Sequence, residues 1–261
     1  QNGSVYRAWL DAHGDLELVR EPIRRWLEGP AGTRESTQFV FKAWLAADGD
    51  PRFVTEPIRR WLEHHDSALT AAFVYHAWLE AGGELELVRA PLERWLAEHG
   101  QTPSASFIHA PWLDHGGEPE LLRESLAGWL VRHCQLRNAQ FSYRAWLGAG
   151  GETEIVRDPL SRWLDAYGDT PQASFVYQAW LRRGGEVGLV TEPLRRWFAA
   201  SQNPTARRIV RETWLAAGGQ PQLADPAAEP EQSAPGHSLP RRGAHPPTLA
   251  GTSRSRPRSR T

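Results

Sequence analysis

Apolar residues recur along the chain in two alternating patterns, both with helical spacing. In the first pattern, Val176, Ala179 and Trp180 fall on one helical face. The second pattern is longer and has apolar positions at Leu87, Val88, Leu92, Trp95 and Leu96. Since both stripes follow the 3.6-residue period, they predict a pair of amphipathic helices.

The residues that flank the first pattern predict where its helix begins and ends. Thr170 is a good N-cap, and Pro171 suits the first helical position, where its missing N–H costs nothing. Gly184 or Gly185 can take the left-handed conformation that ends a helix. These signals predict a helix of about twelve residues.

The tryptophans show that the helix pair is repeated. Trp-Leu pairs recur at intervals of 34 residues, with a first interval of 35, and a second series of tryptophans follows 17 residues after each of the first six pairs. The first series is Trp9, Trp44, Trp78, Trp112, Trp146, Trp180 and Trp214, and the second is Trp26, Trp61, Trp95, Trp129, Trp163 and Trp197. The two series account for all 13 tryptophans, and a fixed period of this length is typical of stacked-repeat proteins.

A proline interrupts the second helix at the same place in most copies. It is found at Pro22, Pro57, Pro91, Pro159 and Pro193, whereas the fourth copy has Ser125. Proline removes one hydrogen bond and kinks a helix, so a bent helix and a restarted helix are both open. Because serine is accepted at this position, a continuous bent helix is favoured.

The chain is therefore predicted to be all-α, with residues 1–220 forming a right-handed α-solenoid. It would contain about six helix-turn-helix repeats plus one half repeat. A single hairpin cannot bury its own apolar face, so most tryptophans are expected to be core and inter-repeat packing. An exposed tryptophan stripe that binds a partner is the alternative.

The 34-residue helix pair resembles the tetratricopeptide-like and HEAT-like α-solenoids in architecture. The first helix departs from the tetratricopeptide consensus, since Trp and Leu are adjacent and Tyr75, Tyr143 or Tyr177 comes three residues before Trp. The sequence LeuValArgGluPro is similar to HEAT units, although the period is shorter than theirs. This resemblance implies a curved rod with a concave face that binds proteins or peptides.

One set of variable positions is the candidate partner-binding face. It lies just before the Ala-Trp of the first helix and changes identity while its neighbours hardly change, as a solvent-facing or ligand-facing position would. The alternative is that these residues are surface and inter-repeat contacts. The face comprises Arg7, Lys42, His76, Arg144 and Gln178, together with the neighbouring Tyr75, Tyr143 and Tyr177. Tyr6, Phe41 and His109 occupy the tyrosine position in the other copies.

Acidic residues that precede arginines by four form a second ladder, on the second helix of each copy. The pairs are Glu21 with Arg25, Glu56 with Arg60, Asp158 with Arg162 and Glu192 with Arg196. The spacing predicts ion pairs on a solvated helix face. The alternative, an arginine ladder that binds phosphates, would suit RNA. Residues 1–220 carry 24 basic and 28 acidic residues, the opposite of the usual charge of a nucleic-acid binder.

No residue set predicts catalysis, a metal or a cofactor. His65, His99 and His133 recur once per repeat, and helices packed about 8–10 Å apart hold such residues too far apart for one metal ion. The single cysteine, Cys134, lacks an identifiable catalytic partner, and no glycine loop suits a phosphate.

Composition changes after Pro221. Residues 221–261 are rich in Pro, Ala, Ser, Gly and Arg and lack tryptophan, which predicts a disordered tail. The tail is either a basic segment for an acidic partner or the product of a shifted reading frame.

The lone cysteine and the absence of a signal peptide or a long apolar run indicate a cytoplasmic protein. Neither end of the array has a convincing polar cap, so we expect it to be part of a longer bacterial protein. Its expected role is that of a protein-interaction scaffold or sensor region. The alternatives are an RNA-binding repeat protein and an accessory domain of an enzyme.

Overall fold

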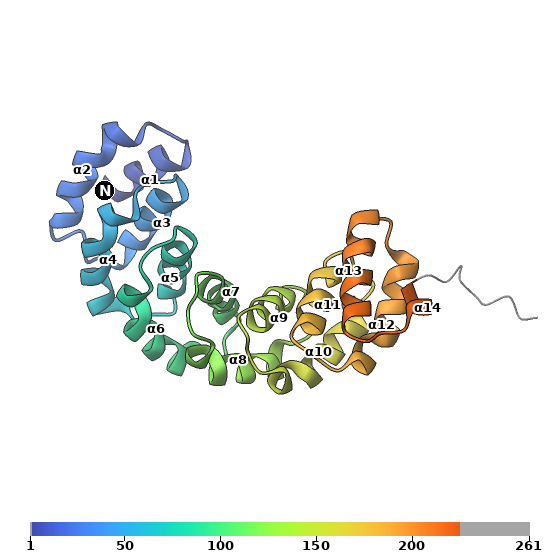
Figure 1. The fold of residues 1–261 in the computed structure, drawn as a ribbon. Helices are drawn as coiled ribbons and strands as arrows, with labels where there is room; N and C mark the ends of the chain where they lie inside the picture. Colours follow the sequence, from blue (N-terminus) through green and yellow to red (C-terminus); the bar gives the residue numbers. More distant parts are fainter. Residues whose placement is uncertain (1, 225–261) are drawn as a thin grey trace, which may run out of the picture. The chain divides into compact units, whose positions relative to one another are not determined.

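The computed structural model describes residues 2–224, and this part of the chain is all-helical (Figure 1). Its α-helices are α1 (Asn2–Asp11), α2 (Leu16–Glu28), α3 (Gln38–Ala46), α4 (Pro51–His65), α5 (Ala71–Glu80), α6 (Leu85–His99), α7 (Ser106–Asp114), α8 (Pro119–His133), α9 (Ala139–Gly148), α10 (Thr153–Tyr167), α11 (Ala173–Arg182), α12 (Val187–Ala200), α13 (Pro204–Ala216) and α14 (Pro221–Ala224). The turns η1 (Glu35–Thr37) and η2 (Pro103–Ala105) are short 3₁₀ helices. Helix α14 extends the helical part beyond the predicted boundary at residue 220, and the rest of the predicted tail lies outside the described residues.

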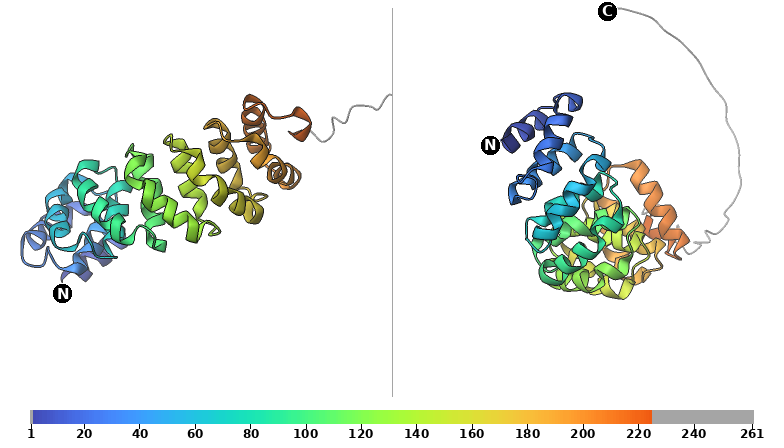
Figure 2. Two further views of the ribbon diagram at one scale, coloured as in Figure 1. Left: turned by 90° about the horizontal axis from the view of Figure 1, so that it is seen from below. Right: turned by 90° about the vertical axis from the view of Figure 1, so that its left-hand side faces the viewer.

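Alternate helices pack side by side in two rows. The odd-numbered helices from α1 to α13 each contact the next odd-numbered helix, and α4 to α12 do the same among the even-numbered ones. Each odd helix from α1 to α11 also contacts the even helix that follows it, which makes a hairpin. The views in Figure 2 show these hairpins following one another in chain order.

The first tryptophan series closes each hairpin. The indole Nε1 of every member donates a hydrogen bond to the backbone carbonyl six residues later, at the start of the even helix, over 2.8–3.1 Å. In the third hairpin, Trp78 donates to Glu84, and the intervening Gly82 takes the left-handed conformation with a φ of 70°. Gly83 lies against the indole ring, where a Cβ atom would overlap it. The two glycines therefore have separate roles, one in the backbone turn and one in packing.

Three members of the second tryptophan series bind the loops that connect one hairpin to the next. Trp61, Trp95 and Trp163 donate hydrogen bonds to the carbonyls of Arg34, Ala68 and Leu136, each 27 residues earlier. From Trp44 onward both series are buried, which confirms that most tryptophans belong to the core. The exceptions are the exposed Trp9 and the half-buried Trp26 of the first hairpin.

Each helix that contains one of these internal prolines is continuous, which confirms the continuity that was predicted and excludes a restarted helix. The predicted N-cap at Thr170 is wrong, because α11 begins at Ala173. Thr170 instead donates its hydroxyl to the carbonyl of Tyr167 over 2.7 Å, at the end of the preceding helix. This hydrogen bond satisfies a carbonyl at the end of the helix that has no partner within the helix.

Candidate interaction surface

Five phenylalanines at one repeat position form an exposed row on the odd-numbered helices. They are Phe39, Phe73, Phe107, Phe141 and Phe175, spaced 34 residues apart, and their exposed fractions lie between 41% and 60%. We call this set the phenylalanine ladder. Regularly repeated exposed aromatic side chains are unusual on a protein surface unless they contact something.

The variable positions of the predicted partner-binding face lie on the same stripe of each helix. Lys42, His76, Arg144 and Gln178 each follow a ladder phenylalanine by three residues, so the two side chains are neighbours on the helix. Arg7 is the corresponding residue of α1, two residues before Trp9. Arg7, Lys42 and Arg144 are exposed, whereas His76 and Gln178 are half-buried.

Cationic and aromatic groups alternate from helix to helix along the first half of this stripe. The Arg7 guanidinium lies 5.1 Å from the ring centroid of Phe39, and the Lys42 ammonium lies 5.7 Å from that of Phe73. Cations at these distances are attracted to an aromatic ring face. The Phe73 and Phe107 ring centroids are 6.3 Å apart. The first three members of the ladder, Phe39, Phe73 and Phe107, therefore form a connected surface across neighbouring hairpins.

His76 and Arg144 also connect neighbouring hairpins. His76 contacts the Phe107 ring, with 6.1 Å between centroids, and its Nδ1 donates to the Phe107 carbonyl over 3.1 Å. Arg144 forms an ion pair with Asp114 of α7, with 2.6 Å between Nη2 and Oδ2. These two side chains thus reach α7 from the odd-numbered helices on its two sides, α5 and α9.

The prediction that Tyr75, Tyr143 and Tyr177 belong to the exposed face is wrong. All three are fully buried, and each ring packs edge-on against the second tryptophan of its own hairpin, with centroids 6.1–6.2 Å apart. The Tyr75 and Tyr177 hydroxyls donate to the carbonyls of Asp66 and Gly168, at the end of the preceding even helix. Burial raises the pKa of all three phenols. These tyrosines are part of the junction between hairpins.

The fourth hairpin carries a histidine in place of this tyrosine. His109 is fully buried, and its Nδ1 lies 3.0 Å from the Ser142 hydroxyl in the next hairpin, while its Nε2 has no partner among the described residues. Burial lowers the pKa of His109 to about 3. The imidazole is therefore neutral at neutral pH.

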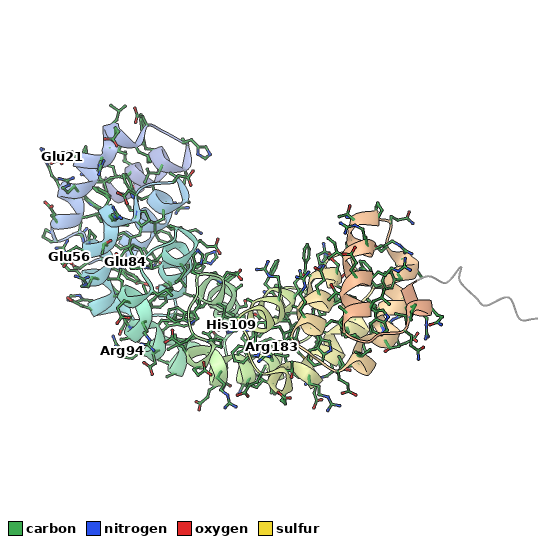
Figure 3. All side chains as sticks on the ribbon, in the orientation of Figure 1. Glu21, Glu56, Glu84, Arg94, His109 and Arg183 are labelled. Atoms are coloured by element: carbon green, nitrogen blue, oxygen red, sulfur yellow. The ribbon has the colours of Figure 1, made fainter. Side chains whose placement is uncertain are left out.

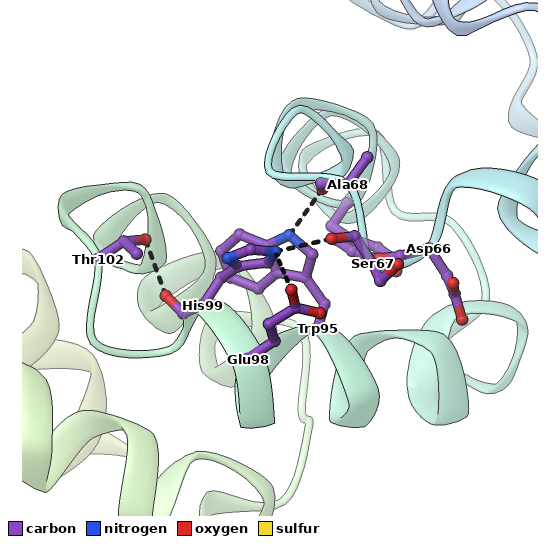
Figure 4. Close-up of polar contacts among 8 residues, drawn as sticks. Asp66, Ser67, Ala68, Trp95, Glu98, His99 and Thr102 are labelled. Carbon is purple, nitrogen blue, oxygen red and sulfur yellow. Dashed lines mark hydrogen bonds and ion pairs between the residues drawn. The ribbon is translucent and has the colours of Figure 1, made fainter.

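The recurring histidines of the even helices are structural contacts. The His99 ring packs on Trp95, with centroids 5.4 Å apart, and its Nε2 donates to the Ser67 carbonyl over 2.7 Å (Figure 4). His65 and His133 make equivalent bonds to Thr33 and Gln101. Within residues 2–224 no group of three or more His, Cys, Asp or Glu side chains could hold a metal ion.

The predicted acid–arginine ladder is only partly formed. Arg25 pairs with Glu21 over 3.0 Å, as expected, whereas Arg60 and Arg196 donate to the carbonyls of Leu27 and Leu164 in the preceding hairpin. These two predicted ion pairs are wrong because backbone carbonyls of the neighbouring repeat lie within reach. The acids Glu21 and Glu56 are exposed on α2 and α4 (Figure 3).

Other arginines of the even helices link one hairpin to the next. Arg123 pairs with Glu152 over 2.8 Å and Arg157 with Glu186 over 3.1 Å, and Arg89 pairs with Glu118 in the same way. Hydrogen bonding to Glu152 raises the pKa of Arg123, and the same bond lowers the pKa of Glu152. All of these ion pairs are largely exposed and screened by solvent, so each contributes little to stability. The arginines of the even helices thus support stacking and leave few guanidinium groups for a phosphate ligand.

Comparison with known proteins adds no family assignment. The chain matches no protein-family model, and no curated protein is significantly similar to it. None of the helices in residues 2–224 has the combination of length and apolar character that is needed to cross a membrane.

Proposed function

We propose that residues 1–220 form a right-handed α-solenoid of about six repeats plus a half repeat, which binds a protein or peptide. In this proposal the chain is a non-catalytic scaffold or sensor region of a larger bacterial protein. The observation that supports it is the phenylalanine ladder, exposed on five consecutive odd-numbered helices. Exposed apolar rows flanked by polar residues are typical of protein interaction sites.

The binding face is the phenylalanine ladder together with Arg7, Lys42, His76, Arg144 and Gln178. Aromatic rings supply apolar contact area with few rotatable bonds, so little conformational entropy is lost on binding. The variable polar positions beside them would supply specificity. An extended partner segment could contact several residues of the phenylalanine ladder, because neighbouring odd-numbered helices are in contact.

Selection from a random peptide library displayed on phage tests this function. The full chain is the bait, and selected peptides are measured by fluorescence anisotropy. In the variant Phe73→Ala/Phe107→Ala/Phe141→Ala we expect at least about a tenfold loss of affinity, since truncated aromatic anchors each cost about 1 kcal/mol or more. Leu18→Ala/Val131→Ala is the matched control, because both residues are exposed apolar side chains on even-numbered helices.

An equal loss in the control, or retained binding in the triple variant, would place the binding face elsewhere. Circular dichroism and thermal melting establish that both variants are folded. Failure to select any peptide would reject peptide binding itself.

Single-stranded RNA is the second candidate ligand. The cations stacked over Phe39 and Phe73 favour it, since single-strand binders combine aromatic platforms with basic side chains. A fluorescent oligouridylate of 20 nucleotides separates the two candidates. If RNA is the ligand, its affinity falls steeply with salt, because phosphate contacts release counterions.

A further inference from the structure

A hollow on the candidate interaction surface lies between α9 and α11. Its volume is about 480 Å³, and it brings together two residues of the predicted face, Arg144 and Gln178. Phe175, Arg182 and Arg183 also line it, and no lining residue among those described is acidic. The hollow therefore combines an aromatic ring, an amide and three guanidinium groups.

Gly148 leaves this hollow open. The same repeat position carries Glu80 in α5, Asp114 in α7 and Arg182 in α11, all of which are exposed. A Cβ atom at Gly148 would meet nothing within 4 Å. Phe175, at the edge of the hollow, is the most exposed residue of the phenylalanine ladder at 60%.

The three arginines differ in how far the protein already uses them. Arg183 donates to the carbonyls of Gly150 and Gly151 over 2.7 and 3.1 Å (Figure 3), and Arg144 is paired with Asp114. Arg182 is exposed and has no carboxylate partner in residues 2–224. A guanidinium group has five N–H donors in a planar fork that matches a carboxylate, so Arg182 can accept an anionic ligand without losing an internal contact.

We propose that this hollow binds the side-chain carboxylate of an acidic residue in the partner segment, with a neighbouring apolar side chain of that segment packed on Phe175. This inference rests on the proposed peptide-binding function and names its partner as an acidic–apolar segment. The charge at the equivalent positions of neighbouring repeats favours a peptide over a nucleic acid. Glu80, on the equivalent position of α5, would repel a phosphate backbone that runs along the row, whereas Asp114 of α7 is already paired with Arg144. A peptide can carry side chains of different charge at successive positions, so it can complement residues of different charge on successive odd-numbered helices.

The peptides selected on the full chain test the inference directly. They are synthesised with amidated C-termini, so that only side-chain carboxylates are negative. Enrichment of Asp or Glu next to an apolar residue is expected among them. Arg182→Glu should weaken these peptides about tenfold, since it replaces an attraction by a repulsion of similar size.

Arg132→Glu is the matched control because it reverses an exposed arginine on α8, away from the stripe. Replacing the peptide's acidic residue by Gln should weaken binding to the wild type and leave binding to Arg182→Glu unchanged, as expected for two interacting groups. Replacing it by Lys should restore affinity for Arg182→Glu.

Each other outcome has a distinct meaning. This inference is overturned if the selected peptides show no acidic enrichment, or if Arg182→Glu does not change their affinity. Peptide binding as such still stands in that case, provided that the phenylalanine triple variant weakens it. An oligouridylate that binds the wild type and is lost with Arg182→Glu assigns the hollow to phosphate and overturns the inference. If no peptide is selected, the proposed function fails first.

Discussion

Substitution of Gly83 by Ala should strongly destabilise the third hairpin. Trp78 is fully buried, and its indole donates to the Glu84 carbonyl over 3.0 Å across the turn that contains Gly83. A Cβ atom on Gly83 would lie within 3.0 Å of three ring atoms of Trp78. Ordinary carbon–carbon contacts need about 3.5–4.0 Å, so the ring or the turn must move.

The expected cost combines two effects. Overpacking a dense core costs about 1–3 kcal/mol. Moving the ring also breaks the indole hydrogen bond and leaves a buried donor and acceptor unpaired, which costs about 1–3 kcal/mol more. We therefore expect a loss of about 4 kcal/mol in the free energy of unfolding.

The adjacent Gly82 provides the matched control. A Cβ atom there would meet nothing within 4 Å, although the φ of 70° is left-handed. Asp48 occupies the equivalent position of the second hairpin with a φ of 57°, so Gly82→Asp should cost only about 1 kcal/mol. Urea titration followed by circular dichroism measures both variants. Equal losses for Gly83→Ala and Gly82→Asp would refute the packing role of Gly83.

Two further predictions concern the junctions between hairpins. Trp95→Phe should cost about 1–3 kcal/mol more than Trp129→Phe in urea titrations, because Trp95 donates to Ala68 whereas the buried Trp129 Nε1 has no partner among the described residues; equal costs would contradict this. His109→Tyr/Ser142→Val, which gives both positions the residues of other copies, should reduce the loss of stability on acidification. The pKa of His109 is about 3 in the folded chain and 6.5 in the unfolded chain. His109 therefore does not lower the free energy of unfolding of the wild type above pH 6.5, but it lowers it by about 1.4 kcal/mol per pH unit as the pH falls below that value. Between pH 7.5 and pH 5 the double variant should lose about 2 kcal/mol less than the wild type in urea titrations, and an equal loss would show that His109 does not control this range.

Helix positions and the burial of tryptophan could be predicted because both follow from spacing along one chain. The apolar stripes are local, and the helix-ending glycines stand beside them. The burial of the tyrosines could also have been predicted from the sequence. Tyr75 precedes Trp78 by three residues and therefore shares its buried face, whereas Phe73 precedes it by five and points away. The 34-residue period of the phenylalanines was the signal for the exposed row.

The arginine contacts could not be predicted from spacing. Glu56 and Arg60 have the spacing of an ion pair, but Arg60 donates to the Leu27 carbonyl, 33 residues earlier. A carbonyl at a helix end lacks an intrahelical partner, so it competes with a solvated carboxylate for the guanidinium. Which carbonyl lies near which arginine depends on the docking of two hairpins, and a helical period contains no information about that docking.

In the proposed function, stability and partner recognition use different faces of the same odd-numbered helices. The contact that closes a hairpin uses a tryptophan, a glycine and a backbone carbonyl. It recurs with hydrogen bonds of 2.8–3.1 Å, whichever residue supplies the carbonyl. The residue two positions before that tryptophan is Lys42, His76, Ala110, Arg144 or Gln178 in successive copies. Because these side chains do not take part in the closing contact, they can change from copy to copy without loss of the contact that closes the hairpin. A partner would then contact a row of constant phenylalanines, which supply affinity, and a row of variable residues, which supply specificity. Substitutions in the two rows should therefore have separable effects on binding.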